Sequence, residues 1–390
     1  MRVAFPMIGG KDWTGGRNYL LNLIRALTKH SPGVLTPVLL FGDDVSTDET
    51  APFACLLGVE LVSTPLLDQD RRLGSLALSL AFGADSAMKR LLKDQRIDVV
   101  FEAAQFFGTR LGIPAIAWLP DFQHRHLPKL FSTFARLKRE LGFRAQIAAG
   151  RTVMLSSDDA RQDCERFYPA TRGRTHTVNF AVPPSGLMDP EASHKIAVSY
   201  GLPRDFFYLP NQFWVHKNHL LVAEALGLLR KQGRRVIVAA SGNTQDPRNP
   251  GYYSQLCERI RTLGVEEDFR LLGLIPYEHL IVLMRSSVAL LNPSLSEGWS
   301  TTVEEARSLG VPLILSDLAV HREQAGDTAS YFERSTVTSL ADALAAFQPL
   351  SPQEREDRRR EAAVDAERRV QIFAERFVAL ARCCHEGGSV

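Results

Sequence analysis

Two glutamates, Glu297 and Glu305, are the residues of this sequence whose type and spacing most directly indicate chemistry. Apolar runs at 288–291 and 313–315 flank them, and each run has the length of a buried strand. A helix is expected between the runs, because the stretch 300–305 supplies a capping hydroxyl with a glutamate three residues further on. In such a strand, loop, helix, strand unit, ligands lie beyond the carboxyl ends of the strands. Both carboxylates are therefore expected at that edge, where they can accept hydrogen bonds from sugar hydroxyls.

The start of this expected helix suits the anionic part of a ligand. A helix N-terminus carries partial positive charge and presents backbone N–H groups that bind phosphates. The candidate binding residues here are Gly298, Trp299, Ser300 and Thr301. An alternative interpretation is that Glu297 is a solvated loop residue, and that Glu304 and Glu305 only favour the first turn of a helix.

The stretch EGWSTTVEEARSLGVP resembles the E-x7-E signature of retaining glycosyltransferases with the GT-B fold, especially glycosyltransferase family four. Both glutamates and Gly298 match the family pattern, whereas Trp299 and Ser300 stand where Phe-Gly is usual. The resemblance implies that Glu305 binds the ribose of a nucleotide-sugar donor and that Glu297 meets the sugar near the reacting centre. It also implies an α/β GT-B fold, with two Rossmann-like lobes facing a central cleft and a C-terminal helix that crosses back to the first lobe.

Short apolar runs alternate with helical patterns along the chain, which predicts parallel sheets covered by helices. The expected strands of the first half are 1–7, 36–41, 61–63, 99–101, 115–119 and 151–156, with a helix at 73–92. Those of the second half are 206–209, 235–240, 269–272, 288–291 and 313–315. Residues 183–190 have linker composition. We therefore predict an acceptor-side lobe at 1–183, a donor-side lobe at 184–365 and a terminal helix at 366–390.

The composition indicates a soluble globular protein large enough for two domains, with 390 residues, 45% of them hydrophobic and 23% charged. A formal net charge of +2 gives no argument for nucleic acid as a partner. The five cysteines have no metal-ligand or disulfide spacing, which indicates a reducing compartment. Neither a signal peptide nor a membrane span is expected, so the predicted location is the cytoplasm.

Lys217 is the predicted cation of the site. It follows the expected strand 206–209 and lies near the start of a helix, where a positive charge offsets that of a diphosphate. Family four enzymes place an Arg six residues before this Lys, and here that position holds Asn211. Asn211 and His216 therefore become candidates for donor contacts. The alternative interpretation of Lys217 is a surface lysine.

Glycines after the first strand permit close approach of the backbone to a phosphate, although Gly9, Gly10, Gly15 and Gly16 do not form the dinucleotide fingerprint. The resemblance places Gly15 and Gly16 at the head of the first helix, near the donor phosphates. A tight turn is the alternative. Gly242 resembles the glycine loop that family members hold near the donor.

Polar residues after the expected strand 115–119 are candidates for a catalytic role. Asp121 matches the family's His-Asp pair, but the His position holds Pro120. His124 is a candidate to supply what that histidine supplies, and His126 is a weaker one. The alternative is that both histidines solvate a loop.

Basic and apolar residues interleave in the expected helix 131–149, as in helices that lie on anionic lipid. Several family four enzymes contact membranes peripherally, so the inner face of a membrane is a second predicted location. A solvated outer face is the alternative.

These residues together predict a glycosyltransferase that moves a sugar from a nucleotide-diphosphate sugar to a glycan, lipid-linked or small-molecule acceptor, as in polysaccharide biosynthesis. The resemblance implies retention of anomeric configuration. We expect no metal and no resident cofactor, because Lys217 and the helix end take the place of a divalent ion. Two alternatives remain open, a GT-B nucleotide-sugar epimerase and a non-catalytic nucleotide-sugar-binding protein.

Overall fold

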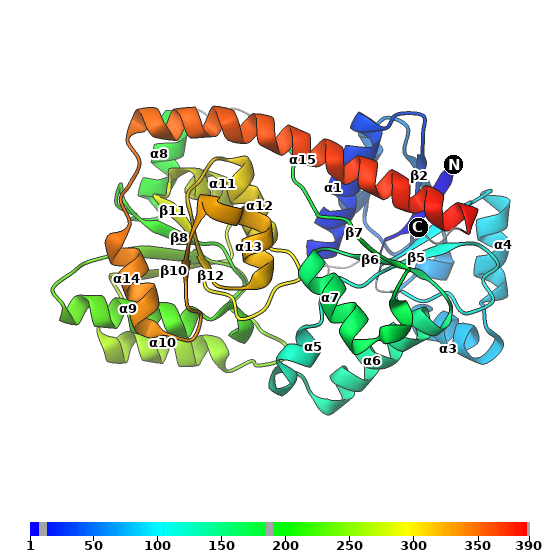
Figure 1. Cartoon of the computed structure of the whole chain (residues 1–390), viewed down its shortest axis with the longest axis horizontal. Coiled ribbons are helices and arrows are strands. Elements are labelled where there is room, and N and C mark those ends of the chain that lie inside the picture. The colour runs from blue at the N-terminus through cyan, green and yellow to red at the C-terminus, as the bar shows by residue number, and fades with distance from the viewer. Residues whose placement is uncertain (8–13, 104, 185–189, 388–390) are drawn as a thin grey trace. The chain divides into compact units, whose positions relative to one another are not determined.

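The computed structural model describes the chain except residues 8–13, 104, 185–189 and 388–390. It is an α/β protein built on two sheets, and every recorded strand pairing is parallel (Figure 1). Unit 1 comprises Met1–Phe122, Thr133–Ala181 and Arg368–Val390, and unit 2 comprises Gln123–Ser132 and Val182–Glu367. The predicted α/β fold class is confirmed.

Unit 1 is built on a seven-stranded sheet in the order β3-β2-β1-β4-β5-β6-β7. The strands are β1 (Arg2–Pro6), β2 (Thr36–Phe41), β3 (Glu60–Ser63), β4 (Val99–Ala103), β5 (Ala115–Trp118), β6 (Thr152–Leu155) and β7 (Thr175–Thr177). Six of them coincide with expected strands, because those runs are apolar and short. Strand β7 was not expected, and its three residues are all only partly buried.

The helices of unit 1 are α1 (Thr14–His30), α2 (Thr47–Ala54), α3 (Arg72–Phe82), α4 (Ser86–Asp94), α6 (Thr133–Ala148), α7 (Asp158–Phe167) and the last part of α15 (Pro352–Glu386). The expected single helix 73–92 is wrong, because the chain breaks it into α3 and α4. Asp85 causes the break: its carboxylate accepts hydrogen bonds from the N–H groups of Ala87 and Met88 and so starts a new helix.

The end of α15 completes the core of unit 1. Its Phe377 ring lies 5.6 Å, centroid to centroid, from both Phe5 of β1 and Phe101 of β4. Phe373, one turn earlier, packs edge-on against Phe180. The predicted return of the C-terminal helix to the first lobe is therefore confirmed.

Unit 2 is built on a six-stranded sheet in the order β10-β9-β8-β11-β12-β13. The strands are β8 (Phe207–Leu209), β9 (Val238–Ser241), β10 (Phe269–Gly273), β11 (Ala289–Asn292), β12 (Leu313–Ser316) and β13 (Ala329–Phe332). The first five coincide with expected strands, whereas β13 was not expected. Its alternating, partly exposed residues belong to an edge strand and form no continuous apolar run.

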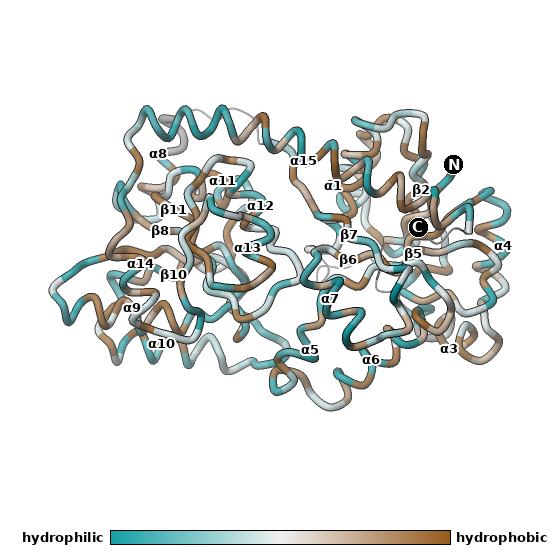
Figure 2. Tube along the Cα trace, viewed as in Figure 1, coloured by the Kyte–Doolittle hydropathy of each residue, from teal (hydrophilic) through white to brown (hydrophobic). Residues whose placement is uncertain are grey.

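Two helical layers cover this sheet (Figure 1). The helices of unit 2 are α5 (Gln123–His126), α8 (Pro190–Ser199), α9 (His219–Lys231), α10 (Tyr252–Leu263), α11 (Tyr277–Ser286), α12 (Thr301–Ser308), α13 (Ala319–Ala325), α14 (Val337–Ala346) and the first part of α15. Because side chains alternate along a strand, Phe207 and Leu209 pack beneath α9, α10 and α14, whereas Tyr208 packs beneath α11 and α12. The first part of α15 is largely hydrophilic (Figure 2).

Within the described residues, no helix combines the length and the apolar character that crossing a membrane requires.

Candidate functional site

The carboxyl edge of the unit 2 sheet gathers most of the predicted site residues. Asn211 follows β8, Gly242 follows β9 and Glu297 follows β11, and these three strands are neighbours in the sheet. A parallel sheet brings the loops after its strands to one edge. The residues that are distant in sequence therefore meet in one region of unit 2.

Lys217 and Glu297 form an ion pair at this edge. The Nζ of Lys217 lies 2.5 Å from Oε1 of Glu297, and the two side chains are only 14% and 10% exposed. Ser294 also donates to Oε1, at 2.7 Å, whereas no hydrogen bond from another described residue reaches Oε2. Lys217 ends a short 3₁₀ turn, Val215–Lys217, and α9 begins two residues later rather than at Lys217.

The environment of Glu297 keeps its carboxylate ionised. Burial pushes its pKa upward, but the charge of Lys217 and contributions from His321 and His216 outweigh burial, so the pKa lies below its usual value. His321 is fully buried, and its Nδ1 lies 3.0 Å from the carbonyl oxygen of Ser316. Burial lowers the pKa of His321 and so favours the neutral ring. The site thus presents one fixed anion beside one fixed cation.

Glu305 has a different environment from Glu297. Its carboxylate lies within α12 and accepts a hydrogen bond from the hydroxyl of Tyr277 at 2.9 Å. Burial raises the pKa of Glu305 to about 7, although the Tyr277 hydrogen bond opposes the shift. Near neutral pH this carboxyl group therefore both donates and accepts hydrogen bonds. Glu304, its neighbour, turns to the other side and pairs with Arg307 at 3.1 Å.

The start of α12 is not the predicted capping box. Ser300 occupies the position before the helix, but its hydroxyl makes no capping bond and instead accepts from Asn292 Nδ2 at 2.9 Å. Gln324 of α13 satisfies the backbone: its Oε1 accepts from Ser300 N–H at 3.3 Å and its Nε2 donates to Ser300 O at 2.8 Å. The N–H of Ser300 is thus already bonded, while Gly298 and Trp299 precede it in the loop and Thr301 begins α12.

Asn211 and Gly242 lie against one another. A Cβ on Gly242 would lie 2.5 Å from the carbonyl oxygen of Asn211, so only glycine allows this approach. The side chain of Asn211 is almost fully buried, and its Oδ1 accepts from the hydroxyl of Thr302 at 3.4 Å. Its Nδ2 has no hydrogen-bond partner among the described residues. An unsatisfied buried donor at a carboxyl strand edge is suited to a ligand oxygen.

The segment that carries His124 belongs to unit 2. Gln123 accepts from Arg248 at 2.7 Å, and the same guanidinium donates to Nδ1 of His216 at 3.1 Å. The Arg248 side chain lies over the ring of Phe131, 5.0 Å from its centroid. His124 is buried, with its ring edge toward Phe131. The structure thus brings the segment of His124 and His126 into the unit that holds Lys217.

The remaining predicted residues lie in unit 1. Asp121 follows β5 and forms an ion pair with Arg139 at 2.7 Å. Gly15 and Gly16 lie in the first turn of α1, which begins at Thr14. Gly9 and Gly10 fall outside the described residues.

Four residues of this region were missed by sequence reasoning: Tyr277, Arg248, His321 and Gln324. The helix or loop that carries each of them contains no sequence motif from which its position in the site could be predicted. The only sequence signal was positional, because Tyr277 and His321 each follow a strand of the sheet within a few residues. The described residues contain no group of three or more His, Cys, Asp or Glu side chains with the arrangement of a metal site.

One known family model matches part of unit 2. Residues 193–364 match the family model described as "Glycosyl transferases group 1". The match covers 172 of the 390 residues and lies within unit 2. The matched range contains Lys217, Glu297 and Glu305. No curated protein matches the chain by sequence.

Solved structures resemble the whole chain. A glycosyltransferase from Rickettsia africae has 15% identity and a TM-score of 0.69, over 99% of this chain and 98% of that one. Anabaena Alr3699/HepE in complex with UDP and glucose has 15% identity and a TM-score of 0.69, over 97% of this chain and 98% of that one. Sucrose-phosphate synthase from Thermosynechococcus elongatus has 13% identity and a TM-score of 0.67, over the full length of both chains. These likenesses establish the GT-B fold.

Proposed function

We propose that this protein transfers a sugar from a nucleotide-diphosphate sugar to an acceptor hydroxyl, with retention of anomeric configuration and without a metal ion. The observation that carries the proposal is the Lys217–Glu297 ion pair at the carboxyl edge of a group 1 glycosyltransferase domain. Glu305 lies eight residues further along the chain, within α12. The family match supports glycosyl transfer, and the residues below support its finer features.

Lys217 is the group that neutralises the diphosphate. Its ammonium is held by Glu297 and lies at the edge where the loops of neighbouring strands meet. A buried cation with one fixed partner is already oriented, so binding a phosphate oxygen costs little side-chain entropy. The start of α12 adds partial positive charge beside it. Stabilising the departing diphosphate in this way lowers the barrier to cleavage.

Glu305 is the group that recognises the ribose. With a pKa raised to about 7, its carboxyl group offers a donor and an acceptor to a diol near neutral pH. Tyr277 fixes its Oε1 by a hydrogen bond, and the Tyr277 side chain is itself half exposed. Tyr277 therefore lies where it can also contact the nucleoside.

Glu297 is the group that faces the sugar. Its ionised carboxylate stabilises positive charge that develops at the anomeric carbon. In the transfer step the bond between this carbon and the diphosphate oxygen breaks, and a bond to the acceptor oxygen forms on the same face. The acceptor proton passes to the departing diphosphate. The acceptor is a glycan, a lipid-linked molecule or a small molecule.

A panel of nucleotide sugars tests this function. A donor that binds only the native state raises the melting temperature, so thermal shifts identify the donor. Incubating that donor with the protein, with and without acceptor candidates, then separates three outcomes. Transfer, or slow hydrolysis of the donor, supports the proposal. Isomerisation of the donor sugar indicates an epimerase, and binding without turnover indicates a binding protein; either result contradicts the proposal.

Helix α6 supports a second feature, peripheral contact with the cytoplasmic face of a membrane. Its Phe134, Leu137 and Leu141 are 76%, 56% and 57% exposed and share one helix face by their spacing. Lys138 and Arg144 border this apolar stripe. Exposed apolar side chains flanked by cations are typical of helices that lie on anionic lipid.

Vesicle sedimentation tests this contact. We expect binding to vesicles of phosphatidylglycerol in phosphatidylcholine, little binding to phosphatidylcholine alone, and loss of binding when Phe134, Leu137 and Leu141 are all replaced by Ser. Replacing the exposed Val364 by Ser is the matched control. Equal binding of the triple variant and the control would contradict a role for α6.

A further inference from the structure

An arginine-lined pocket lies at the amino edge of the unit 2 sheet, away from the candidate functional site. Arg285 and Ser287 line it just before β11, and residues 309–312 line it just before β12. Lys217 and Glu297 belong to the opposite, carboxyl edge of the same strands. The pocket is therefore not part of the proposed donor site.

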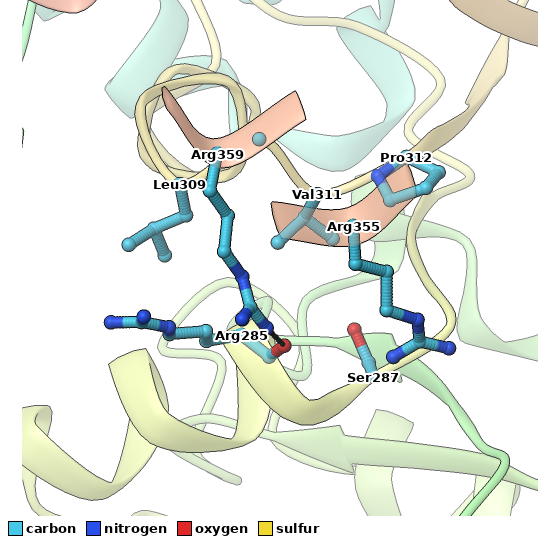
Figure 3. A pocket seen from close by; sticks show the side chains of 8 residues that line it. Arg285, Ser287, Leu309, Val311, Pro312, Arg355 and Arg359 are labelled. Carbon is cyan, nitrogen blue, oxygen red and sulfur yellow. Dashed lines mark hydrogen bonds between the residues drawn. The ribbon is translucent and has the colours of Figure 1, made fainter. Parts of the chain in front are cut away.

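Helix α15 forms one wall of the pocket. Arg355 and Arg359, one turn apart, reach down from α15 on either side of Val311 (Figure 3). Close packing fixes the helix, because a Cβ on Gly310 would lie 2.8 Å from the carbonyl oxygen of Arg358. Arg359 also donates to the carbonyl oxygen of Arg285 at 3.4 Å. The two arginines of α15 are thus held over the segment that begins β11.

The positive charge in this pocket is only partly balanced, because two carboxylates, Glu356 and Asp205, act on its three arginines. Arg359 pairs with Glu356 at 3.6 Å, but Glu356 is shared with Arg360 at the same distance. Neither Arg285 nor Arg355 forms an ion pair with another described residue. Arg355 uses its Nε to donate to the carbonyl oxygen of Leu350 at 3.2 Å.

Burial and mutual repulsion both lower the pKa values of Arg285 and Arg355. Burial, followed by the charge of Arg359, lowers the pKa of Arg285. Burial also lowers the pKa of Arg355, and Arg359 adds to the effect despite the opposing charge of Asp205. Three guanidinium groups that share a half-buried pocket repel one another unless an anion lies between them.

We propose that this pocket binds a phosphate group through Arg285, Arg355 and Arg359. Guanidinium groups form paired, charge-assisted hydrogen bonds with phosphate oxygens, and the hydroxyl of Ser287 lies in the same lining. The cavity volume is only about 10 Å³, so one phosphate oxygen enters and the rest of the group stays at the mouth. Because the rest of the phosphate stays at the mouth of the pocket, an organic group attached to it has room. The phosphate belongs to a free anion, a phosphorylated metabolite or a lipid headgroup.

Calorimetric titration with inorganic phosphate tests the proposal, carried out in a Lys217→Ala background so that the proposed donor site does not contribute. We expect saturable binding at one site and a rise in melting temperature with phosphate. Arg285→Ala and Arg359→Ala should each weaken binding by about tenfold or more, because each removes a charge-assisted contact. Arg360→Ala is the matched control on the same helix, and its affinity should change by less than about twofold, since Arg360 does not line the pocket.

Two further measurements make the outcome decisive. Arg359→Lys keeps the charge but not the paired geometry, so it should bind phosphate with an affinity between that of the Ala variant and the background, with unchanged circular dichroism. Sedimentation with phosphatidylglycerol vesicles separates the sources of phosphate: loss of lipid binding in Arg285→Ala assigns a headgroup, and unchanged lipid binding assigns a soluble phosphate. Absence of saturable binding in both arms, or equal losses in Arg360→Ala and Arg359→Ala, would overturn the proposal. The result is independent of whether the carboxyl edge transfers sugar.

Discussion

Lys217 Nζ lies 2.5 Å from Glu297 Oε1, and both side chains are largely withdrawn from water at the carboxyl edge of a parallel sheet. A buried ion pair of this kind gives little net stability, because desolvation offsets the attraction between the charges. It nevertheless fixes the position of both charges before a ligand arrives. Removing either partner alone leaves an uncompensated buried charge.

Stability measurements should reveal the pairing directly. Lys217→Met is expected to lower the free energy of unfolding by about 3 kcal/mol, because Glu297 is left buried without its cation. Adding Glu297→Gln to the same chain should recover most of that loss. Urea unfolding of the wild type, both single variants and the double variant measures the coupling. Additive losses in the double variant would show that the two side chains are independent.

The pH dependence of stability should report on Glu305. Its pKa rises from 4.5 to about 7 in the folded state, so between these values the native protein holds a proton that the unfolded chain releases. Glu305 by itself therefore contributes a fall in stability of up to about 3 kcal/mol as pH rises from about 4.5 to 7, and this contribution is constant above that range. The buried His219 and His321, whose pKa values are lowered, contribute an opposing rise below about pH 6.5. Glu305→Gln should make the slope of stability against pH more positive than in the wild type between about pH 4.5 and 7, whereas Glu267→Gln at an exposed position should keep the wild-type slope. An unchanged slope in Glu305→Gln would contradict the assignment.

Ligand binding should separate the phosphate end of the site from the nucleoside end. Lys217→Ala removes charge beside the diphosphate and nothing beside the base, so donor and nucleoside-diphosphate affinities should fall by about tenfold or more. The affinity of the nucleoside alone should change little. Calorimetry with all three ligands makes the comparison. Equal losses for the three would mean that Lys217 only supports the fold.

Much of the fold was predictable because it rests on local patterns. The buried strands of both sheets are short apolar runs, and Gly310 before β12 marked the end of α12. The division of 73–92 into two helices was not predicted, because an Asp85 side chain overrides a continuous apolar pattern there. The edge strands β7 and β13 lack an apolar run and were missed for that reason.

The candidate site was predictable only in part. Glu297, Glu305 and Lys217 lie at one edge of one sheet, as strand topology requires. The partners of this region were not predictable, because Tyr277 reaches Glu305 from α11 and Gln324 reaches Ser300 from α13, through packing between distant segments. The predicted capping box is absent for the same reason. The hydroxyl of Ser300 accepts a hydrogen bond from Asn292, and the N–H of Ser300 donates to Gln324, so these groups are already bonded to other segments.

Transfer should proceed in a chelator. Lys217 and the start of α12 take the role that a divalent ion has in other nucleotide-sugar sites, so activity in excess EDTA should stay within about twofold of the untreated rate. Initial rates with and without EDTA, and after addition of magnesium or manganese, give the comparison. Complete loss in EDTA that either ion restores would contradict metal independence.

The most direct test of the central claim compares Glu297→Gln with Glu305→Ala, using transfer rates and calorimetric nucleoside-diphosphate affinities on folded variants. The claim predicts that Glu297→Gln lowers kcat by about 100-fold or more while the nucleotide affinity stays nearly unchanged, because its carboxylate acts on charge that develops in the transition state. It predicts that Glu305→Ala weakens nucleoside-diphosphate binding by about tenfold, because its carboxyl group holds the ribose. Wild-type transfer and wild-type nucleotide affinity in both variants would contradict the account, since these glutamates would then be only favourable charges near a helix start.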